Sequence, residues 1–546
     1  MSYPRLIQTL IIEDDSPALY DAVFEDLVRN GERLAECIHA YGHEAALRQL
    51  KSDRILHLVL LDLRLPNVSD HPAQEGINYG LNLLEECSTR DLFPIPVLMV
   101  ISGHLEQAEQ LELQAKVNDN FYYGKVLVKS PQVGSALTVA VDEVKKYLGV
   151  GIHIRDTQGE TYPTIGPRDE DLLRRCLLKR NNCIGVDLKW WSAEYGLASG
   201  SYAGFTGWTK ILTGRLLFAG DASSRLCFFK FSPAAGADTV ISNAQMMEHK
   251  LAHIKVLGAL LSSNRSLLIT QKVGSSDEEP VSLANYLALP WTETMDSLPA
   301  IVRDIANQVR ALGNLTEERC PVRELLWPNH SRPQLNAEWE RNGGREIIDN
   351  LSEAFDPISL YDELNSDVTV VTFKRQSFRH GDLNITNIAI DLGDKEPAAY
   401  IFDASGCASG PNVRDLATLE VSSLLHHPGT RIESLVESCA ELYSPAKSNN
   451  FHFDRGSDLA QNTFKLVSEI RSKAFQQEDS FLYTLMVFDN ALIQLGSLAF
   501  GHSRNKIANP RDAVRLAAYS ARWLRAMIEA SGRQRTLHLR LTDEGI

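Results

Sequence analysis

The densest chemical pattern in this chain is Arg379-His380-Gly381-Asp382-Leu383-Asn384-Ile385-Thr386-Asn387, which is followed after an apolar run by Ile401-Phe402-Asp403. Phosphoryl transfer from a nucleoside triphosphate needs an acid that orients the attacking hydroxyl, and Asp382 can supply it. It also needs an amide and a carboxylate that hold a metal ion on the phosphates, and Asn387 and Asp403 are of those types. The sequence therefore predicts a phosphoryl-transfer site in this stretch.

Local structure is expected to bring the two metal-binding candidates together. The short apolar runs 388–390 and 400–402 flank Gly393-Asp394-Lys395-Glu396, and this pattern predicts a β-hairpin. Such a hairpin would return Asp403 to the neighbourhood of Asn387. We expect His380 to brace the loop between them.

A glycine-rich stretch, 196–207, lies upstream between two β-type runs at 184–191 and 209–218. Glycines such as Gly200 and Gly204 let backbone amides approach phosphates closely. Taken alone, the same composition also fits an ordinary turn.

A lysine and an acid that could pair on the nucleotide follow this stretch. Lys230 ends a strand pattern at 226–230, and a helical pattern at 245–257 carries Glu248. An ion pair between them would place the ammonium group on the phosphates. Glu248 could equally lie on a solvated helix face, since Glu318 is an alternative partner.

Residues from about 185 to 535 resemble the kinase-like fold of aminoglycoside and choline phosphotransferases, and more narrowly the bacterial family called ternary complex associated domain 9. The resemblance implies Mg²⁺ and ATP as cofactors, with Asp382 as the catalytic aspartate and Asn387 and Asp403 as metal ligands. Asp415, in Arg414-Asp415-Leu416-Ala417, is expected to anchor the loop.

One departure separates the chain from eukaryotic protein kinases. Asp403-Ala404-Ser405 stands where those enzymes carry Asp-Phe-Gly, and no recognisable activation segment follows. The pattern therefore favours a small-molecule phosphotransferase over a protein kinase. The pair His426-His427, beside Pro428-Gly429, is interpreted as a helix end and not as a phosphorelay site.

The first 150 residues contain apolar runs that each end at polar side chains. The runs and the side chains that follow them are 6–12 with Asp14 and Asp15, 56–61 with Asp62, 96–101 with Ser102, and 125–128 with Lys129. Helical patterns lie between the runs, which predicts a doubly wound parallel sheet. The carboxyl ends of its strands share one crevice, so these polar side chains should meet there.

These polar residues indicate a second phosphoryl chemistry. Carboxylates of Asp14, Asp15 and Asp62 repel one another and are stable together mainly when a cation such as Mg²⁺ joins them. Asp62 could then attack phosphorus. Ser102 could hydrogen-bond the transferred group, and Lys129 could pair with its charge.

Residues 1 to about 148 resemble a response-regulator receiver domain. The resemblance implies an acidic metal-binding pair at Asp14 and Asp15, a phospho-acceptor at Asp62, and the family's hydroxyl and lysine residues at Ser102 and Lys129. It also implies a phosphoryl donor, either a sensor histidine kinase or a phosphotransfer protein. The family's aromatic switch position falls at Val126, where Tyr122 or Tyr123 could substitute.

The resulting fold prediction is α/β. A doubly wound, five-stranded parallel receiver sheet is followed by a bilobal α+β kinase-like domain with a largely helical C-terminal lobe. The predicted parts are a receiver domain at 1–150, a linker with a helix at 151–183, an N-lobe at 184–290, and a C-lobe at 291–546 that carries the catalytic loop 379–387.

Composition limits the partners. The net charge is −15, with no basic stripe of the kind that nucleic-acid binders carry, so nucleic acid is not an expected partner. The eight cysteines include no Cys-x-x-Cys pair, which predicts reduced thiols. No apolar stretch reaches the ~18 residues of a membrane span, so we expect a cytoplasmic protein without a membrane partner.

Three functions fit the sequence. The first is a two-component response regulator, phosphorylated on Asp62, that controls a kinase-like output domain acting on an unknown acceptor. The second makes the output domain a non-catalytic nucleotide- or protein-binding scaffold in a signalling or conflict complex. The third is a constitutive small-molecule kinase whose receiver serves as a dimerisation surface. The sequence leaves open whether the output domain is active.

Overall fold

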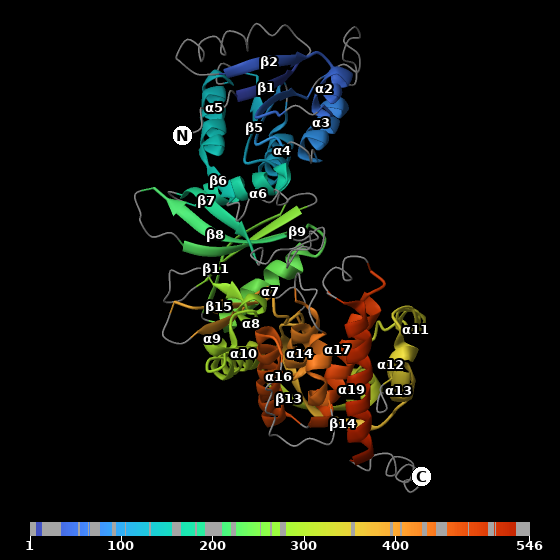
Figure 1. Cartoon of the computed structure of the whole chain (residues 1–546). Coiled ribbons are helices and arrows are strands. Elements are labelled where there is room, and N and C mark those ends of the chain that lie inside the picture. The colour runs from blue at the N-terminus through green and yellow to red at the C-terminus, as the bar shows by residue number, and fades with distance from the viewer. Residues whose placement is uncertain are drawn as a thin grey trace. The chain divides into compact units, whose positions relative to one another are not determined.

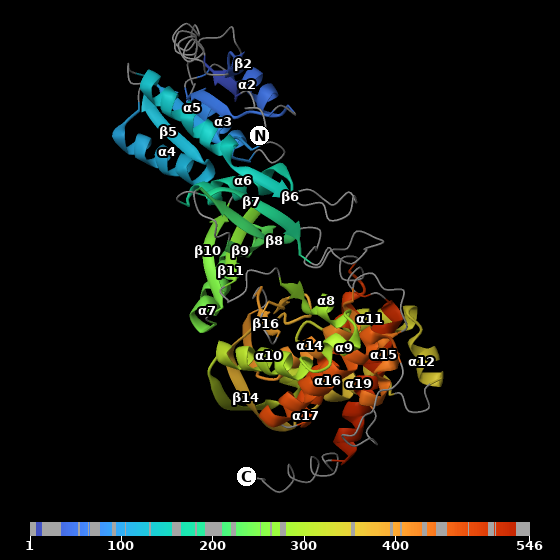
Figure 2. The same ribbon diagram turned by 60° about the vertical axis from the view of Figure 1, so that its left-hand side comes forward.

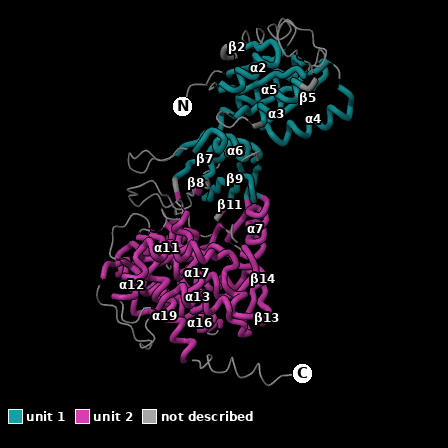
Figure 3. Tube along the Cα trace, turned by 90° about the vertical axis from the view of Figure 1, so that its right-hand side faces the viewer, with its two compact units in different colours: residues 1–189, 213–237, 257–269 teal, residues 190–212, 238–256, 270–546 magenta. Residues whose placement is uncertain are grey.

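The computed structural model of the chain divides into two compact units (Figure 3). Unit 1 comprises residues 1–189, 213–237 and 257–269, and unit 2 comprises 190–212, 238–256 and 270–546. The structure describes residues 7–13, 34–52, 55–63, 65, 77–89, 94–103, 105–129, 133–154, 165–180, 183–191, 210–219, 225–251, 253–261, 265–272, 280–350, 355–393, 397–403, 407–427, 434–443, 456–478, 480–500, 507 and 509–530. The domain boundaries expected from the sequence stay a prediction.

Unit 1 begins with a five-stranded parallel sheet, which confirms the sheet predicted for the first 150 residues. Its strand order is β2-β1-β3-β4-β5, and every neighbouring pair is parallel. The strands are β1 (Ile7–Ile12), β2 (Leu34–Ala40), β3 (Leu58–Asp62), β4 (Val97–Ser102) and β5 (Tyr123–Val128). This order is that of a doubly wound sheet with its crevice between β1 and β3.

Helices cover both faces of this sheet (Figure 1). They are α2 (His43–Leu50), α3 (Ile77–Thr89), α4 (Gln107–Asn120) and α5 (Val133–Gly149). Successive strand residues point to opposite faces, so Leu10 packs in the core under α2, α3 and α4, while Ile11 packs in the core under α5. Burial on both faces explains why β3 and β4 are apolar up to their last residues, Asp62 and Ser102.

A six-stranded sheet follows, with strand order β10-β11-β9-β8-β7-β6. Its strands are β6 (Gly151–Ile154), β7 (Cys183–Trp190), β8 (Lys210–Phe218), β9 (Arg225–Pro233), β10 (Ile254–Leu261) and β11 (Arg265–Lys272). The helix predicted at 245–257 is α7 (Ala237–Lys250). It begins earlier and ends earlier than expected, because 254–257 belong to β10.

Helix α6 (Pro167–Leu178) lies between the two sheets within unit 1 (Figure 2). Three of its arginines donate hydrogen bonds to carbonyl oxygens near the C-terminal ends of other helices. Arg168 bonds Ser88 in α3, Arg175 bonds the last two residues of α4, and Arg174 bonds Tyr147 in α5 and also Val150. Cations at helix C-termini are stabilised by the carbonyls that have no partner within the helix and by the helix dipole.

The same helix is joined to the six-stranded sheet. Arg265 of β11 donates two hydrogen bonds to the Asp169 carboxylate, at 2.9 and 3.2 Å. Arg180, just after α6, bonds the carbonyl oxygen of Leu257 in β10. Helix α6 therefore holds the five-stranded and six-stranded sheets together as parts of one unit.

Unit 2 is mainly helical from residue 283 onward, which confirms a helical C-terminal part. Its helices are α8 (Leu283–Leu287), α9 (Trp291–Thr294), α10 (Leu298–Leu312), α11 (Arg332–Arg341), α12 (Gly344–Asn350), α13 (Pro357–Asn365), α14 (Arg414–Leu425), α15 (Leu435–Ser438), α16 (Asp458–Gln477), α17 (Ser480–Ser497) and α19 (Pro510–Ala530), with 3₁₀ turns η1 (Val322–Leu325) and η2 (Ala440–Tyr443). Residues of most of these helices form one large apolar core.

Two three-stranded sheets of unit 2 frame the stretch 379–403. One contains β12 (Val281–Ser282), β15 (Ile388–Asp391) and β16 (Ala398–Ile401) in the order β12-β15-β16. The other contains β13 (Leu315–Pro321), β14 (Val370–Arg379) and β17 (Ala408–Pro411) in the order β13-β14-β17. None of the helices that the structure describes is both long enough and apolar enough to cross a membrane.

Candidate functional site

The first candidate site lies at the carboxyl ends of β3, β4 and β5. Asp62 is the last residue of β3, Ser102 the last of β4, and Lys129 follows β5 directly. Asp62 is paired with Ile101 and Ser102 with Val128 in the parallel register, and the Lys129 amide donates to the Ser102 carbonyl at 2.9 Å. The sheet thus gathers three of the predicted residues at one edge.

Lys129 bridges a buried pair of carboxylates there. Its Nζ lies 2.8 Å from Asp62 Oδ2 and 2.9 Å from Glu13 Oε1. Burial alone would lower the pKa of Lys129, but its hydrogen bonds to Asp62 and Glu13 outweigh this and raise the pKa. The ammonium group therefore stays charged at neutral pH, in direct contact with both carboxylates.

Glu13 is a site residue that the sequence prediction missed. Its side chain is buried, and it follows β1 directly because that strand ends at Ile12. The sequence could have indicated Glu13, because the first residue after a parallel strand lies at the carboxyl edge of the sheet. The predicted metal ligands Asp14 and Asp15 lie outside the described residues. Within the part of the chain that the structure describes, no group of three or more His, Cys, Asp or Glu could hold a metal ion.

Val126 and Tyr122, which were considered for the position of the aromatic switch residue, both contact the helices that cover the sheet. Val126 is buried in the core under α2, α3 and α4. The Tyr122 hydroxyl donates to Glu143 Oε2 in α5 at 2.7 Å, and its ring lies 5.8 Å from that of Tyr147. Burial and Glu143 raise the pKa of Tyr122, so its hydroxyl remains a donor. Tyr122 therefore connects the start of β5 with α5.

The second candidate site is the loop between β14 and β15 together with the residues after β16. Strands β15 and β16 are antiparallel, with Ile388 opposite Ile401, as the predicted hairpin requires. The Phe402 amide donates to the Asn387 carbonyl at 3.0 Å. The hairpin therefore brings the backbone of Asn387 next to the residue that precedes Asp403.

Amide groups of the loop surround Asp382. Asn387 Nδ2 donates to the Asp382 carbonyl oxygen at 2.8 Å and lies 3.4 Å from its Oδ2, while Asn384 Nδ2 lies 3.2 Å from Oδ1. Since its amide nitrogen is committed to Asp382, Asn387 can offer only Oδ1 to a cation. This arrangement fits the predicted role of Asn387 as an oxygen ligand for Mg²⁺.

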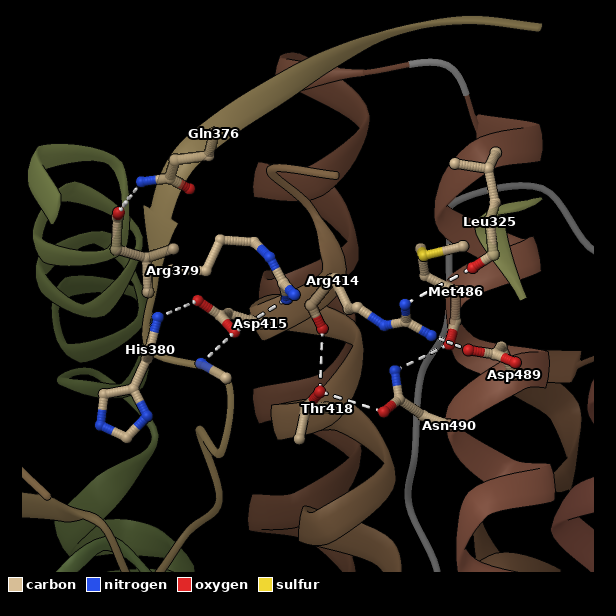
Figure 4. Close-up of polar contacts among 12 residues, drawn as sticks. Leu325, Gln376, Arg379, His380, Arg414, Asp415, Thr418, Met486, Asp489 and Asn490 are labelled. Carbon is tan, nitrogen blue, oxygen red and sulfur yellow. Dashed lines mark hydrogen bonds and ion pairs between the residues drawn. The ribbon is translucent and has the colours of Figure 1, made fainter. Parts of the chain in front are cut away.

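Asp415 anchors the start of this loop, in the way expected from the sequence (Figure 4). Its Oδ2 accepts the His380 amide at 2.8 Å, and its Oδ1 accepts the Gly381 amide at 3.0 Å. The Arg379 guanidinium lies 3.5 Å from the same carboxylate, which is fully buried. Burial and the nearby Arg379 lower the pKa of Arg414 to about 10, and Arg414 pairs with Asp489 of α17.

The other end of the loop is held by His380 and carries backbone strain. His380 Nε2 donates to the Phe402 carbonyl oxygen at 2.8 Å, which is the bracing role predicted for it. The next residue, Asp403, has φ of +65° and is the only non-glycine residue in the described ranges with positive φ. Strain of this kind persists only where the surrounding structure enforces it, and it concentrates at functional sites.

The remaining predicted nucleotide contacts are divided between the units or lie outside the described ranges. Gly200 and Gly204 belong to a stretch that the structure does not describe. Lys230 lies buried in β9 in unit 1, and Glu248 lies in α7 in unit 2, so their ion pair stays a prediction. The alternative acid Glu318 is paired with Arg375 at 2.7 Å.

Two simpler interpretations agree with the structure. All eight cysteines are free thiols. His426 stands at the C-terminal end of α14, where its Nε2 lies 3.0 Å from Gln494 Oε1. Burial lowers the pKa of the adjoining His427 to about 4, so this imidazole is neutral near pH 7.

No protein-family model and no curated protein matches this chain. Among solved structures it is similar to amicoumacin kinase hAmiN, determined in complex with AMP-PNP, Ca²⁺ and Ami. The identity is 12%, the match covers 62% of this chain and 90% of the other, and the TM-score is 0.28. A microcompartment-associated aminopropanol kinase is 13% identical over 59% of this chain and 90% of its own, with a TM-score of 0.29. TM-scores this low do not establish a shared fold.

Proposed function

We propose that this chain is a kinase-like nucleotide-binding protein whose activity is controlled by phosphorylation of Asp62. The observation that carries the nucleotide site is the arrangement of the loop 379–403. Two side-chain amides donate to Asp382, Asn387 keeps one side-chain oxygen available, and the hairpin brings Phe402, which precedes Asp403, to the Asn387 backbone. These are the groups that phosphoryl transfer from Mg-ATP requires.

In this proposal Asn387 and Asp403 hold Mg²⁺ on the phosphates, where it would neutralise charge that develops during transfer. Asp382 orients the acceptor hydroxyl and accepts its proton as the oxygen bonds to the γ-phosphorus and ADP leaves. The phosphate contacts that the sequence predicts for Lys230, Glu248, Gly200 and Gly204 stay predictions. The acceptor in this proposal is a hydroxyl compound, and the two-lobed arrangement stays a prediction.

The Asp62 pocket supports the regulatory half of the proposal. Asp62 attacks the phosphorus of a phosphohistidine on a sensor kinase or phosphotransfer protein, and the histidine leaves. An acidic side chain beside Asp62, such as Glu13, Asp14 or Asp15, would hold Mg²⁺ there. Lys129, already bonded to Asp62, would remain close to the new phosphoryl group and balance its charge. Ser102 would donate a hydrogen bond to it.

Two measurements on the full chain test the two sites separately. Acetyl phosphate with Mg²⁺ should form a base-labile acyl phosphate on the wild type and none on Asp62→Asn. ATP turnover with a panel of hydroxylated acceptors should occur in the wild type and vanish in Asp382→Ala, while nucleotide binding is retained. Nucleotide binding without turnover on any acceptor would favour the scaffold function. No nucleotide binding would exclude both a kinase and a nucleotide-binding scaffold.

A further inference from the structure

Trp191 touches the residues that precede both candidate metal ligands of the loop. Its indole Nε1 donates to the Thr386 carbonyl oxygen at 2.7 Å, and Thr386 directly precedes Asn387. Its ring meets the Phe402 ring edge-on at 5.3 Å, and Phe402 directly precedes Asp403. One side chain therefore restrains the backbone on both sides of the metal site.

The surroundings of Trp191 make this contact rigid. Its side chain is almost fully buried, at 2% exposure. Burying an indole is favourable only when its N–H finds a partner, and here the Thr386 carbonyl supplies that partner. Phe402 is fixed in addition by its amide, which donates to Asn387, and by its carbonyl, which accepts from His380. The three contacts leave little freedom between Asn387 and Asp403.

The backbone of Trp191 lies at the base of the glycine-rich connection. Trp191 directly follows β7, and its amide donates to the Ile211 carbonyl at 3.2 Å, where β8 begins. The glycine-rich stretch 196–207 is the chain that runs between these two bonded residues. Trp191 therefore bonds both to Ile211, on the far side of this connection, and to Thr386, in the loop that carries the candidate metal ligands.

We infer that Trp191 is a positioning residue for the metal site formed by Asn387 and Asp403. The inference rests on the proposed nucleotide function and deepens it. In this role Trp191 acts through Thr386 and Phe402 and is not itself a metal ligand. It sets the separation of the two ligands through Thr386 and Phe402, and its loss should weaken Mg²⁺ binding more than nucleotide binding at saturating Mg²⁺.

The test measures the Mg²⁺ concentration that gives half-maximal binding of AMP-PNP to the full chain. Trp191→Phe keeps an aromatic ring but removes the N–H donor to Thr386. Groups that orient metal ligands typically contribute ten- to a hundredfold to metal affinity, so we expect the half-saturating Mg²⁺ concentration to rise about tenfold. AMP-PNP affinity at saturating Mg²⁺ should change much less.

The matched control is Trp339→Phe in α11, which makes the same chemical change in another buried tryptophan of unit 2. It should lose stability to a similar degree without altering the Mg²⁺ dependence. If Trp191→Phe does not fold, Phe402→Leu removes the ring contact from the other side and should raise the Mg²⁺ requirement as well.

The outcomes separate this inference from the proposed function. An unchanged Mg²⁺ requirement in Trp191→Phe, or in Phe402→Leu where that variant replaces it, overturns the positioning role while nucleotide binding stands. An equal rise in the Trp339→Phe control would show a general loss of stability and overturns it too. Failure of the wild type to bind AMP-PNP overturns the proposed function and this role together.

Discussion

The Asp62 pocket draws its charged groups from three separate strands, whereas the Asp382 loop draws its own from the continuous stretch 379–403 with Asp415 beneath it. In the pocket, which consists of Asp62, Glu13, Ser102 and Lys129, a single ammonium group contacts two carboxylates directly. In the loop, Asp382 contacts the side-chain amides of Asn384 and Asn387. The ion pair there is formed by two other residues, Asp415 and Arg379. We therefore expect a change of charge in the pocket to leave the backbone of the sheet in place. The conformation of the loop, in contrast, depends on Asp415.

Removing the anchor should have the largest effect. Asp415→Ala leaves the His380 and Gly381 amides without their acceptor and strands the Arg379 guanidinium in a buried position. Breaking such a buried pair destabilises a protein by about 3–5 kcal/mol. Urea unfolding of the full chain measures this, and AMP-PNP binding should be lost with it. Asp415→Asn keeps the shape and part of the hydrogen bonding, so it should lose less. Equal losses in the two variants would contradict an anchor that acts through hydrogen bonds to the His380 and Gly381 amides.

Replacing the central cation of the pocket should have a smaller effect. Lys129→Met leaves Asp62 and Glu13 buried beside each other without a counter-charge, but the lysine side chain is 30% exposed, which reduces the cost to about 2 kcal/mol. Added Mg²⁺ should restore part of this stability. A variant as stable as the wild type without Mg²⁺ would show that the lysine contributes nothing.

The same ion pair predicts how stability depends on alkaline pH. The pKa of Lys129 is raised in the folded chain, so its contribution is complete below the unfolded value near ~10.4 and is lost as the pH rises through the folded value. The difference in unfolding free energy between wild type and Lys129→Met should therefore be constant between pH 7 and 9 and shrink at higher pH. A difference that shrinks below pH 9 would contradict this.

Relieving the strain at Asp403, the second candidate metal ligand, should have the smallest effect on stability, with the opposite sign. Glycine adopts positive φ without steric cost, so Asp403→Gly should stabilise the chain by up to about 1 kcal/mol while it weakens Mg²⁺-dependent nucleotide binding. Asp403→Asn tolerates the same φ and should weaken binding with little change in stability. Thermal unfolding and AMP-PNP titration check both, and destabilisation by glycine would contradict strain at this position.

The parts of both candidate sites that follow from apolar runs and turns close together in the sequence could be predicted from the sequence. The apolar runs of β3, β4 and β5 ended at Asp62, Ser102 and Lys129, and the hairpin register followed from two short runs around a turn. Parallel topology then fixed which residues share an edge, because the carboxyl ends of the strands coincide. Strand β2 was not among the apolar runs, since this edge strand carries Glu36 and His39.

Contacts between residues far apart in sequence could not be predicted in this way. The bond from Trp191 to Thr386 and the pairing of Arg414 with Asp489 follow from tertiary packing that no periodicity encodes. Helix α6 is a further case. A helix was expected within 151–183, but no pattern in the sequence indicated that its arginines are buried against the ends of three other helices.

The central claim is that the chemistry at Asp62 controls the nucleotide site, and one titration tests it most directly. AMP-PNP affinity of the full chain is measured with Mg²⁺ before and after treatment with acetyl phosphate, with Asp62→Asn as the control. A coupling of the usual size changes the wild-type affinity by a factor of at least ~5 and leaves the control unchanged. Complete acyl phosphate formation with unaltered wild-type affinity would contradict the claim.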